Sequence, residues 1–358
     1  MRLTGNKGEW SELYTLLRLL ETGRLYAADD KLQIIDDIYF PVLKIFRDGE
    51  DGSGNEKVTY EVCEPQKKVS LYVGDEKVTE LAQSELGRDA RLLLWAIKAG
   101  GDRAFKIQGA DKIMERLHCA KIKAPGSEKA DIVVQIHDAN TGYKPVVGFS
   151  IKSDLGSAPT LLNASEATNF AYECSGISDA EAAEINAIAT RNKILDRMEK
   201  IGARMKYARV NNSVFENNLL LVDSLMEDIV AEMLLYYYRG EASSLSDLAS
   251  LLEKRNPLGV KKKGYYTYKL RKLLSAVALG MVPSKPWSGK DEANGGYIIV
   301  CKNGECLAYH IYNRDQFEQY LLNNTKLERG STTRHKFAVI YEVEGKRFVN
   351  LNLQIRFK

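Results

Sequence analysis

The chain has 358 residues, of which 44% are hydrophobic and 28% are charged, a composition typical of a soluble globular protein with one large or two ordinary domains. The 51 basic and 48 acidic residues leave a net charge of only +3, so any binding of nucleic acid has to depend on local clusters of positive charge. No apolar run approaches the roughly 18 residues of a membrane span, and the polar, basic N-terminus does not resemble a secretory signal. We therefore expect a cytoplasmic protein that does not contact a membrane.

Five scattered cysteines and four histidines limit the metal chemistry that the chain can perform. The odd number of cysteines argues against a disulfide framework, and the few histidines leave little material for a zinc site. Any bound metal is therefore expected to have oxygen ligands, which favours magnesium.

In chain order, hydrophobic spacing first predicts a helix from Glu9 to Glu21, which ends before Gly23. A β-rich stretch and two further helices follow. The predicted strands are 40–46, 57–63 and 69–73, and the predicted helices are 89–98 and 111–117.

The second half of the chain has a helical pattern first and a pattern of strands after it. Residues 158–281 have an almost wholly helical pattern, strongest from Glu216 to Arg239. A short helix is then predicted at 315–322, among the strands 297–301, 307–312, 337–343 and 348–357. This order predicts an α/β (α+β) protein: a central mixed sheet flanked by helices, with a large helical insertion and a C-terminal β-rich part.

No internal repeat or long linker divides the chain, so we expect a single domain over residues 1–358. Its expected subdivision is a catalytic core at 1–175, a helical region at 176–290 and a C-terminal β region at 291–358.

The candidate catalytic residues lie in one stretch of the middle of the chain. Asp131 opens a strand (DIVVQIHD), a turn follows at 140–142, and a second strand (PVVGFSIK) ends at Lys152. A polar loop and a predicted helix that carries Glu166 come next. Because side chains alternate along a strand, Ser150 and Lys152 share a face and can lie beside Asp131. Two acids and a lysine placed in this way can hold a divalent metal beside a phosphate. The alternative is a surface hairpin with a weak ion pair.

The spacing of these residues resembles that of PD-(D/E)xK nucleases in which the acid two positions before the lysine has migrated. Ser150-Ile151-Lys152 is followed, after thirteen residues, by Glu166, and Ala130 replaces the usual proline before Asp131. The first, middle and last parts of the chain are also similar to the HpaII family of type II restriction endonucleases. The matching runs are GNKGEWSELYTLL, FSIKSDLGSAPTLLNASEATNF and STTRHKF…LNLQIRF.

This resemblance implies a restriction-endonuclease-like fold and a Mg²⁺-dependent enzyme that cuts double-stranded DNA at CCGG, leaving 5′-phosphate and 3′-hydroxyl ends. It also implies a cognate methyltransferase in the same system, without direct contact. A metal ion held by Asp131, Glu166 and the Ile151 carbonyl would neutralise phosphate charge and lower the pKa of bound water. Lys152 would contact the phosphate and orient the water, with Ser150 as a spectator or supporting hydrogen-bond partner.

Three further acids compete for a place at this site. Many nucleases of the superfamily carry a glutamate on an early helix that points at the metal, and Glu12 is preferred to Glu9 for this role. The alternative is that both acids simply favour the first turn of a helix. Asp154, two residues beyond Lys152, is interpreted as a loop or base-contact residue.

Contacts with DNA are expected from two other parts of the chain. Residues 261–272 alternate lysines and arginine with tyrosines, and basic side chains neutralise phosphates; the alternative is a solvated helix start with inward tyrosines. Guanine is best read by a basic side chain, so Arg334 and His335 are the first candidates for base recognition. The DNA-contact candidates are Lys261, Lys262, Lys263, Lys269, Arg271, Arg334, His335, Asp154, Ser157 and Asn163, with Asn169 as a further amide.

Cutting both strands of a palindrome needs two active sites related by a two-fold axis, so a homodimer is expected. Two other functions remain open at this point. A structure-specific repair or recombination nuclease would cut without regard to sequence, and a DNA-binding protein with an inactive nuclease site would bind duplex DNA without nicking it.

Overall fold

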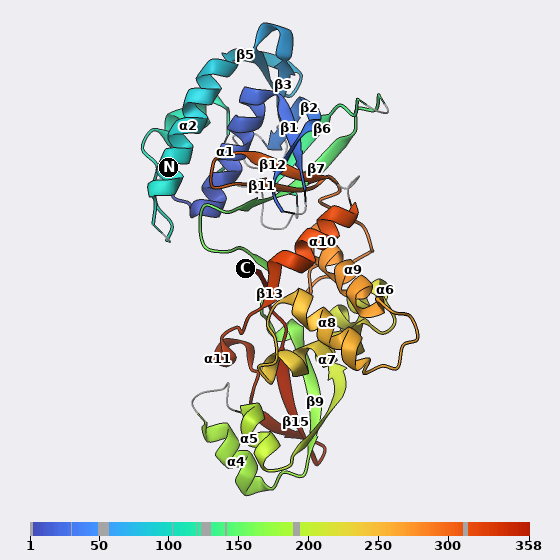
Figure 1. Ribbon diagram of the computed structural model, residues 1–358. Helices are drawn as coiled ribbons and strands as arrows, with labels where there is room; N and C mark the ends of the chain where they lie inside the picture. The colour runs from blue at the N-terminus through green and yellow to red at the C-terminus, as the bar shows by residue number, and fades with distance from the viewer. Residues whose placement is uncertain are drawn as a thin grey trace. The chain divides into compact units, whose positions relative to one another are not determined.

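The computed structural model describes residues 3–29, 31–48, 57–101, 103–119, 121–122, 130–139, 142–188, 194–310 and 314–358. The chain forms two compact units, each assembled from two separate stretches of sequence (Figure 1). Unit 1 contains Met1–Pro159 and Asp291–Phe317, and unit 2 contains Thr160–Lys290 and Glu318–Lys358. Both combine helices with sheets, which confirms the predicted mixed α/β class. The single domain stays a prediction.

Unit 1 is built around a nine-stranded mixed sheet in the order β1-β12-β11-β7-β6-β2-β3-β4-β5. Because β1 pairs with β2 as well as with β12, the six strands from β1 to β2 close into a ring. The strands are β1 (Arg24–Ala28), β2 (Ile34–Asp48), β3 (Lys57–Cys63), β4 (Lys68–Val73), β5 (Glu76–Ala82), β6 (Ile132–Ile136), β7 (Val146–Ser153), β11 (Gly296–Val300) and β12 (Cys306–His310).

The central strand β7 lies between antiparallel β6 and parallel β11. It is buried continuously from Val147 to Ile151, as expected for an apolar strand covered on both faces. The predicted strands of this unit are confirmed. The predicted turn at 140–142 falls partly outside the described residues, because Asn140 and Thr141 are not among them.

Among the described residues, three α-helices lie wholly within unit 1: α1 (Lys7–Thr22), α2 (Gln83–Ala99) and α3 (Ala110–Arg116). All three confirm predicted helices, and α1 shows why its ends could be located. Asn6 and Glu9 form a reciprocal capping box, and Gly23 ends the helix in a left-handed conformation with φ 63°. Nine residues of α1 are buried, and this helix lies between α2 and the sheet (Figure 1).

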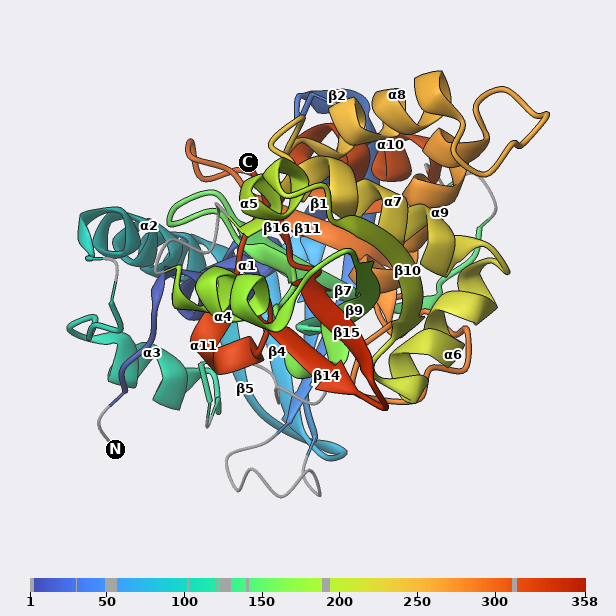
Figure 2. The same cartoon turned by 90° about the horizontal axis from the view of Figure 1, so that it is seen from below.

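Unit 2 contains a four-stranded sheet in the order β10-β9-β15-β14 and a three-stranded sheet in the order β13-β16-β8. Figure 2 shows β9, β15 and β14 side by side. The strands are β8 (Thr160–Leu162), β9 (Asn169–Ser175), β10 (Arg204–Val210), β13 (Thr325–Leu327), β14 (Ile340–Val343), β15 (Lys346–Asn352) and β16 (Ile355–Phe357).

The helices of the second half of the chain surround these sheets, and α10 contributes residues to both units. They are α4 (Asp179–Ala187), α5 (Ile194–Lys200), α6 (Ser213–Val222), α7 (Met226–Tyr238), α8 (Leu245–Arg255), α9 (Tyr265–Leu279), α10 (Arg314–Asn324) and α11 (Thr332–His335). No helix within the described ranges is long and apolar enough to cross a membrane.

The prediction of an almost wholly helical stretch at 158–281 was wrong, because it contains β8, β9 and β10. Strand β9 pairs with β15, far along the chain, and this non-local pairing overrides the local pattern. The predicted helix from Glu216 to Arg239 is two helices, α6 and α7. They separate at Asp223, whose Oδ1 accepts a hydrogen bond of 3.0 Å from the Leu225 amide and so offers the backbone an alternative to the helix.

Candidate active site

Asp131 lies directly before β6 and is held against β7 by three hydrogen bonds. Its amide donates to the Phe149 carbonyl at 2.8 Å. Its Oδ2 accepts from the Ser150 hydroxyl at 3.0 Å and from the Ile151 amide at 2.6 Å. These contacts fix the carboxylate at the N-terminal end of β6, beside the last residues of β7.

Lys152 completes this arrangement through the same serine. Its Nζ donates to Ser150 Oγ at 2.8 Å, so the hydroxyl joins the lysine to the aspartate. The amine also lies 5.1 Å from the ring centroid of Tyr297 on β11, a cation–π distance. The sequence placed Asp131, Ser150 and Lys152 together from the strand period. It could not reveal Tyr297, because the parallel pairing of β11 with β7 is not visible in a local pattern.

Gly148 lets Ala130, the residue before Asp131, approach β7 closely. A Cβ at this glycine would stand 2.7 Å from the Ala130 Cβ and 3.2 Å from the Glu292 carbonyl oxygen. The Gly148 amide also donates to Asn294 Oδ1 at 2.8 Å. The space beside Ala130 is therefore filled by neighbouring atoms, which gives Gly148 a positioning role that the sequence pattern did not indicate.

Helix α1 brings a second acid to this part of unit 1. Ser11 Oγ donates to Ser153 Oγ at 2.8 Å, which joins the helix to the end of β7. The next residue, Glu12, is half-buried, and its negative charge favours the protonated form of Lys152. Glu9 is engaged elsewhere, because its Oε2 accepts from the Asn6 amide at 2.9 Å in the helix cap. Of the two early glutamates, Glu12 is the one placed near Lys152.

The electrostatic environment of Lys152 combines two opposing effects. Desolvation by burial is the larger and lowers the pKa of Lys152, whereas the charges of Asp131 and Glu12 raise it. The net result is a pKa below the ordinary value. A lysine of this kind exchanges a proton nearer to neutral pH than an exposed lysine does.

The oxygen donors around Asp131 fit a hard divalent cation. Asp131 Oδ1 receives no hydrogen bond from the residues that the structure describes, so it remains available as a ligand. Because the Ile151 amide faces Asp131 and the N–H and C=O of one strand residue point the same way, the Ile151 carbonyl faces that side too. Glu12 can add a second carboxylate. Within the described parts of the chain, no group of three or more His, Cys, Asp and Glu side chains is close enough to hold a metal.

The loop after β7 in unit 1 buries Leu155 and exposes the residues on either side of it. Asp154 is exposed and lies 3.7 Å from Lys302, measured from Oδ2 to Nζ, and Ser157 is exposed as well. Both are accessible to a ligand, and neither is hydrogen-bonded to Lys152.

Glu166 belongs to unit 2, and the prediction that a helix carries it was wrong. It begins a single 3₁₀ turn (Glu166–Thr168) between β8 and β9, because the chain must turn there to enter the β9–β15 ladder. Its carboxylate is 57% exposed and lies 3.0 Å from the Lys336 amine. Asn163 is exposed in the preceding loop.

Of the remaining base-reading candidates, two lie on α11 and one is buried. Arg334 and His335 belong to this short helix, and Arg334 is exposed. Asn169 is buried and donates to the His335 carbonyl at 2.8 Å. Asn169 therefore stabilises unit 2 and has no access to a ligand.

The basic segment 261–272 divides into exposed and ion-paired residues. Lys261, Lys262 and Lys263 are exposed before α9, and none of them forms an ion pair with a described residue. Lys269 pairs with Asp223, and Arg271 Nε lies 3.6 Å from the buried Glu318 carboxylate. Lys272 shares the Glu318 carboxylate with Arg271, so the three lysines before α9 are the basic residues of this segment that are both exposed and without an ion pair to a described residue.

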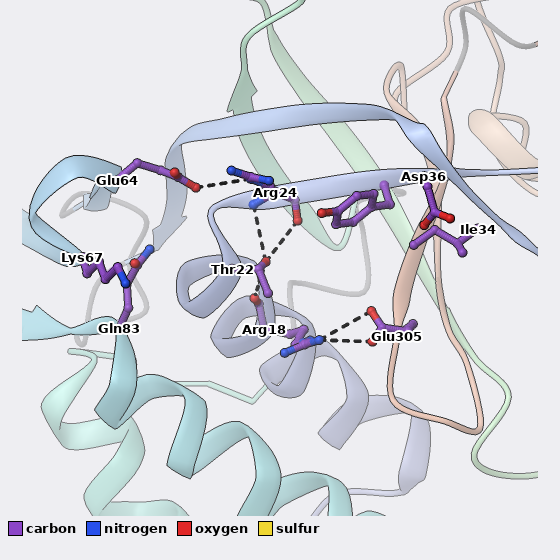
Figure 3. A pocket seen from close by; sticks show the side chains of 10 residues that line it. Arg18, Thr22, Arg24, Ile34, Asp36, Glu64, Lys67, Gln83 and Glu305 are labelled. Carbon is purple, nitrogen blue, oxygen red and sulfur yellow. Dashed lines mark hydrogen bonds and ion pairs between the residues drawn. The ribbon is translucent and has the colours of Figure 1, made fainter.

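A separate pocket of about 670 Å³ opens in unit 1 beside the C-terminal half of α1 (Figure 3). It is lined by three cationic and three acidic side chains together with neutral ones. Arg18 pairs with Glu305 at 3.2 Å, and Arg24 lies 3.6 Å from Glu64. Because the charges are balanced, the pocket offers little attraction to a polyanion.

Comparison with known proteins agrees with the chemistry of this site. The model of the HpaII restriction endonuclease family matches residues 6–357. The chain is 38% identical over 358 residues to the type II restriction enzyme HpaII of Haemophilus parainfluenzae, covering 99% of this chain and 98% of that enzyme. No solved structure matches the chain. The protein is therefore a type II site-specific deoxyribonuclease. Within that class, it belongs to the HpaII restriction endonuclease family, as the sequence motifs indicated.

Proposed function

We propose that this enzyme hydrolyses phosphodiester bonds of double-stranded DNA at the short palindrome CCGG, with Mg²⁺, and leaves 5′-phosphate and 3′-hydroxyl ends. The observation that carries the proposal is the hydrogen-bonded chain Asp131–Ser150–Lys152 at the ends of β6 and β7. The similarity to the HpaII family supports the target sequence and a restriction-endonuclease-like arrangement of the central sheet.

In the proposed site, Asp131 Oδ1 and the Ile151 carbonyl hold the metal ion, with a further carboxylate from Glu166 or Glu12. Bound Mg²⁺ would supply charge neutralisation at the phosphate and a lower pKa for water. The ammonium of Lys152 contacts a non-bridging phosphate oxygen and orients the attacking water. Ser150 keeps the Lys152 amine beside Asp131. The inclusion of Glu166 rests on the sequence motif, and that of Glu12 on its position beside Lys152.

Base recognition is assigned in this proposal to the exposed Arg334 with His335, and supporting contacts to Asn163, Asp154 and Ser157. The active enzyme is a homodimer, because both strands of a palindrome must be cut by equivalent sites. We place it in the cytoplasm, since all five cysteines are free, as in reducing compartments. A cognate methyltransferase would protect the host DNA without touching this chain.

Digestion of a sequenced plasmid tests the proposal directly. With Mg²⁺ we expect discrete fragments whose ends lie at every CCGG, and with EDTA we expect intact plasmid, because the phosphate charge is no longer neutralised. A plasmid in which every CCGG has been altered is the control and should stay uncut. A smear would favour a structure-specific nuclease, and an unchanged plasmid with Mg²⁺ would favour a binding protein without nuclease activity.

The three exposed lysines before α9 provide a second test. Replacing Lys261, Lys262 and Lys263 by Gln should weaken DNA binding at 150 mM salt by about tenfold or more and reduce the salt dependence of binding, since fewer phosphates are neutralised. Lys326→Gln, which changes a partly buried lysine on β13, is the control. Equal salt slopes for the triple variant and the wild type would show that this segment does not contact phosphates.

A further inference from the structure

The start of β11 places the ring of Tyr297 beside Lys152. The Gly295 amide donates to the Gly148 carbonyl at 2.7 Å, and this bond helps to fix the register in which Tyr297 pairs with Ser150. Registered neighbours in a sheet share a face, and side chains alternate along each strand. Tyr297, Ser150 and Lys152 therefore lie on the same face of the sheet.

Two groups on this face hold the Lys152 amine. Ser150 Oγ accepts a hydrogen bond from Nζ at 2.8 Å, and Nζ lies over the Tyr297 ring at 5.1 Å from its centroid. A ring face attracts an ammonium through its quadrupole, but it does not take up a strong charge-assisted hydrogen bond as a carboxylate would. Because an ammonium has three N–H donors, Lys152 keeps donors available for a phosphate oxygen.

Packing with two other aromatic rings fixes the Tyr297 ring. Tyr297 is 1% exposed and makes a T-shaped contact with Phe317 on α10, with centroids 5.1 Å apart and planes at 67°. Phe317 also lies 6.3 Å from the ring of Tyr309 on β12. A group that positions another side chain must itself be locked by packing, and the Tyr297 ring meets this condition.

From this geometry we propose that Tyr297 is a positioning residue for cleavage, whose ring face holds the Lys152 ammonium where its free N–H groups reach a non-bridging phosphate oxygen. The inference rests on the proposed function, in which Lys152 contacts the phosphate, and it assigns Tyr297 a role that acts through Lys152. A role in packing alone would depend on the size of the ring, whereas the positioning role depends on the charge distribution of its face.

Tyr297→Leu should lower the single-turnover rate of cleavage of a CCGG duplex about 30-fold, equivalent to about 2 kcal/mol, which is typical of a desolvated cation–π contact. Tyr297→Phe keeps the ring face and should stay within about threefold of the wild type. Tyr309→Leu is the matched control, because it removes an equally buried ring that packs on the same Phe317. It should lower the melting temperature without slowing cleavage. A Tyr297→Phe or Tyr309→Leu variant as slow as Tyr297→Leu would overturn the inference.

Fluorinated phenylalanines in place of Tyr297 separate the charge of the ring from its packing, even if Tyr297→Leu folds poorly. Each fluorine withdraws negative charge from the ring face and changes the size of the ring little. Across phenylalanine and its analogues with one, two and three fluorines, the cleavage rate should fall stepwise, while the melting temperature and the binding of duplex in EDTA stay nearly constant. Equal rates across the series would show that Tyr297 contributes packing alone.

An NMR signal of Lys152 separates a failure of this inference from a failure of the proposed function. In protein labelled with carbon-13 lysine, the ring current of Tyr297 should move the Lys152 ε-methylene signal upfield, and Lys152→Met identifies that signal. The upfield shift should persist in Tyr297→Phe and disappear in Tyr297→Leu.

The NMR and cleavage results together give distinct outcomes. If the wild type cuts CCGG with Mg²⁺ but the fluorinated series cuts at one rate, the nuclease proposal stands and the positioning role of Tyr297 is wrong. If the wild type does not cut while the Lys152 signal behaves as expected, the placement of the amine stands and the proposed function is wrong. A Lys152 signal at the ordinary lysine position in the wild type would refute the ring contact itself.

Discussion

Lys152→Met and Asp131→Asn should each lower the single-turnover rate of cleavage of a CCGG duplex by about 10³-fold or more. Lys152→Met removes the only charge that Ser150 positions beside Asp131. Asp131→Asn keeps a group that can accept from the Ile151 amide but removes the negative charge needed to hold a cation. Rates measured at saturating enzyme report the chemical step and not the encounter with DNA.

Binding of the same duplex in EDTA should remain within about threefold of the wild type for both variants, with Asp131→Asn slightly tighter because an anion is removed. Lys302→Met is the matched control, because Lys302 is 79% exposed and lies beside Asp154 on the neighbouring hairpin. Normal cleavage by Lys152→Met or Asp131→Asn would mean that the site lies elsewhere in the chain.

Glu166→Gln should lower the cleavage rate by about 10²-fold and raise the Mg²⁺ concentration needed for half-maximal rate, because the proposed site includes this carboxylate as a metal ligand. Glu12→Gln should lower the cleavage rate by about tenfold, because the negative charge of Glu12 favours the protonated form of Lys152. Asp154→Asn should cleave at nearly the wild-type rate. Titration of Mg²⁺ at fixed enzyme distinguishes these outcomes.

A control separates metal binding by Glu166 from its ion pair. Lys336→Met removes the partner that lies 3.0 Å from Glu166 but keeps the carboxylate. If Lys336→Met reduces cleavage as strongly as Glu166→Gln, the ion pair and not the carboxylate is what matters. A loss confined to Asp154→Asn would replace the migrated-acid hypothesis with one based on the loop after β7.

Much of unit 1 could be predicted because its signals are local. The capping residues Asn6 and Glu9 and the glycine at 23 delimit α1 within a few positions. The apolar run before Lys152 predicted β7, and the two-residue period placed Ser150 and Lys152 on one face. The same period brought Asp131 beside them, because adjacent strands of a hairpin keep a regular register.

Other parts of the candidate site depended on contacts between distant segments. Glu12 approaches Lys152 because Ser11 bonds to Ser153, and Tyr297 lies near Lys152 because β11 pairs with β7. Neither contact leaves a periodic signal in the sequence. Strand β9 was predicted as helix for a similar reason, since one of its two partner strands, β15, comes from the end of the chain.

The sequence by itself determined the local elements around Asp131 and Lys152, and the family to which the chain belongs, because caps, strand periods and motifs are properties of neighbouring residues. Only the tertiary structure decided that β1 closes the ring with β2 and that each unit is assembled from two separated stretches. These features come from pairing and packing between residues far apart in the chain, where burial and hydrogen bonding outweigh local preference.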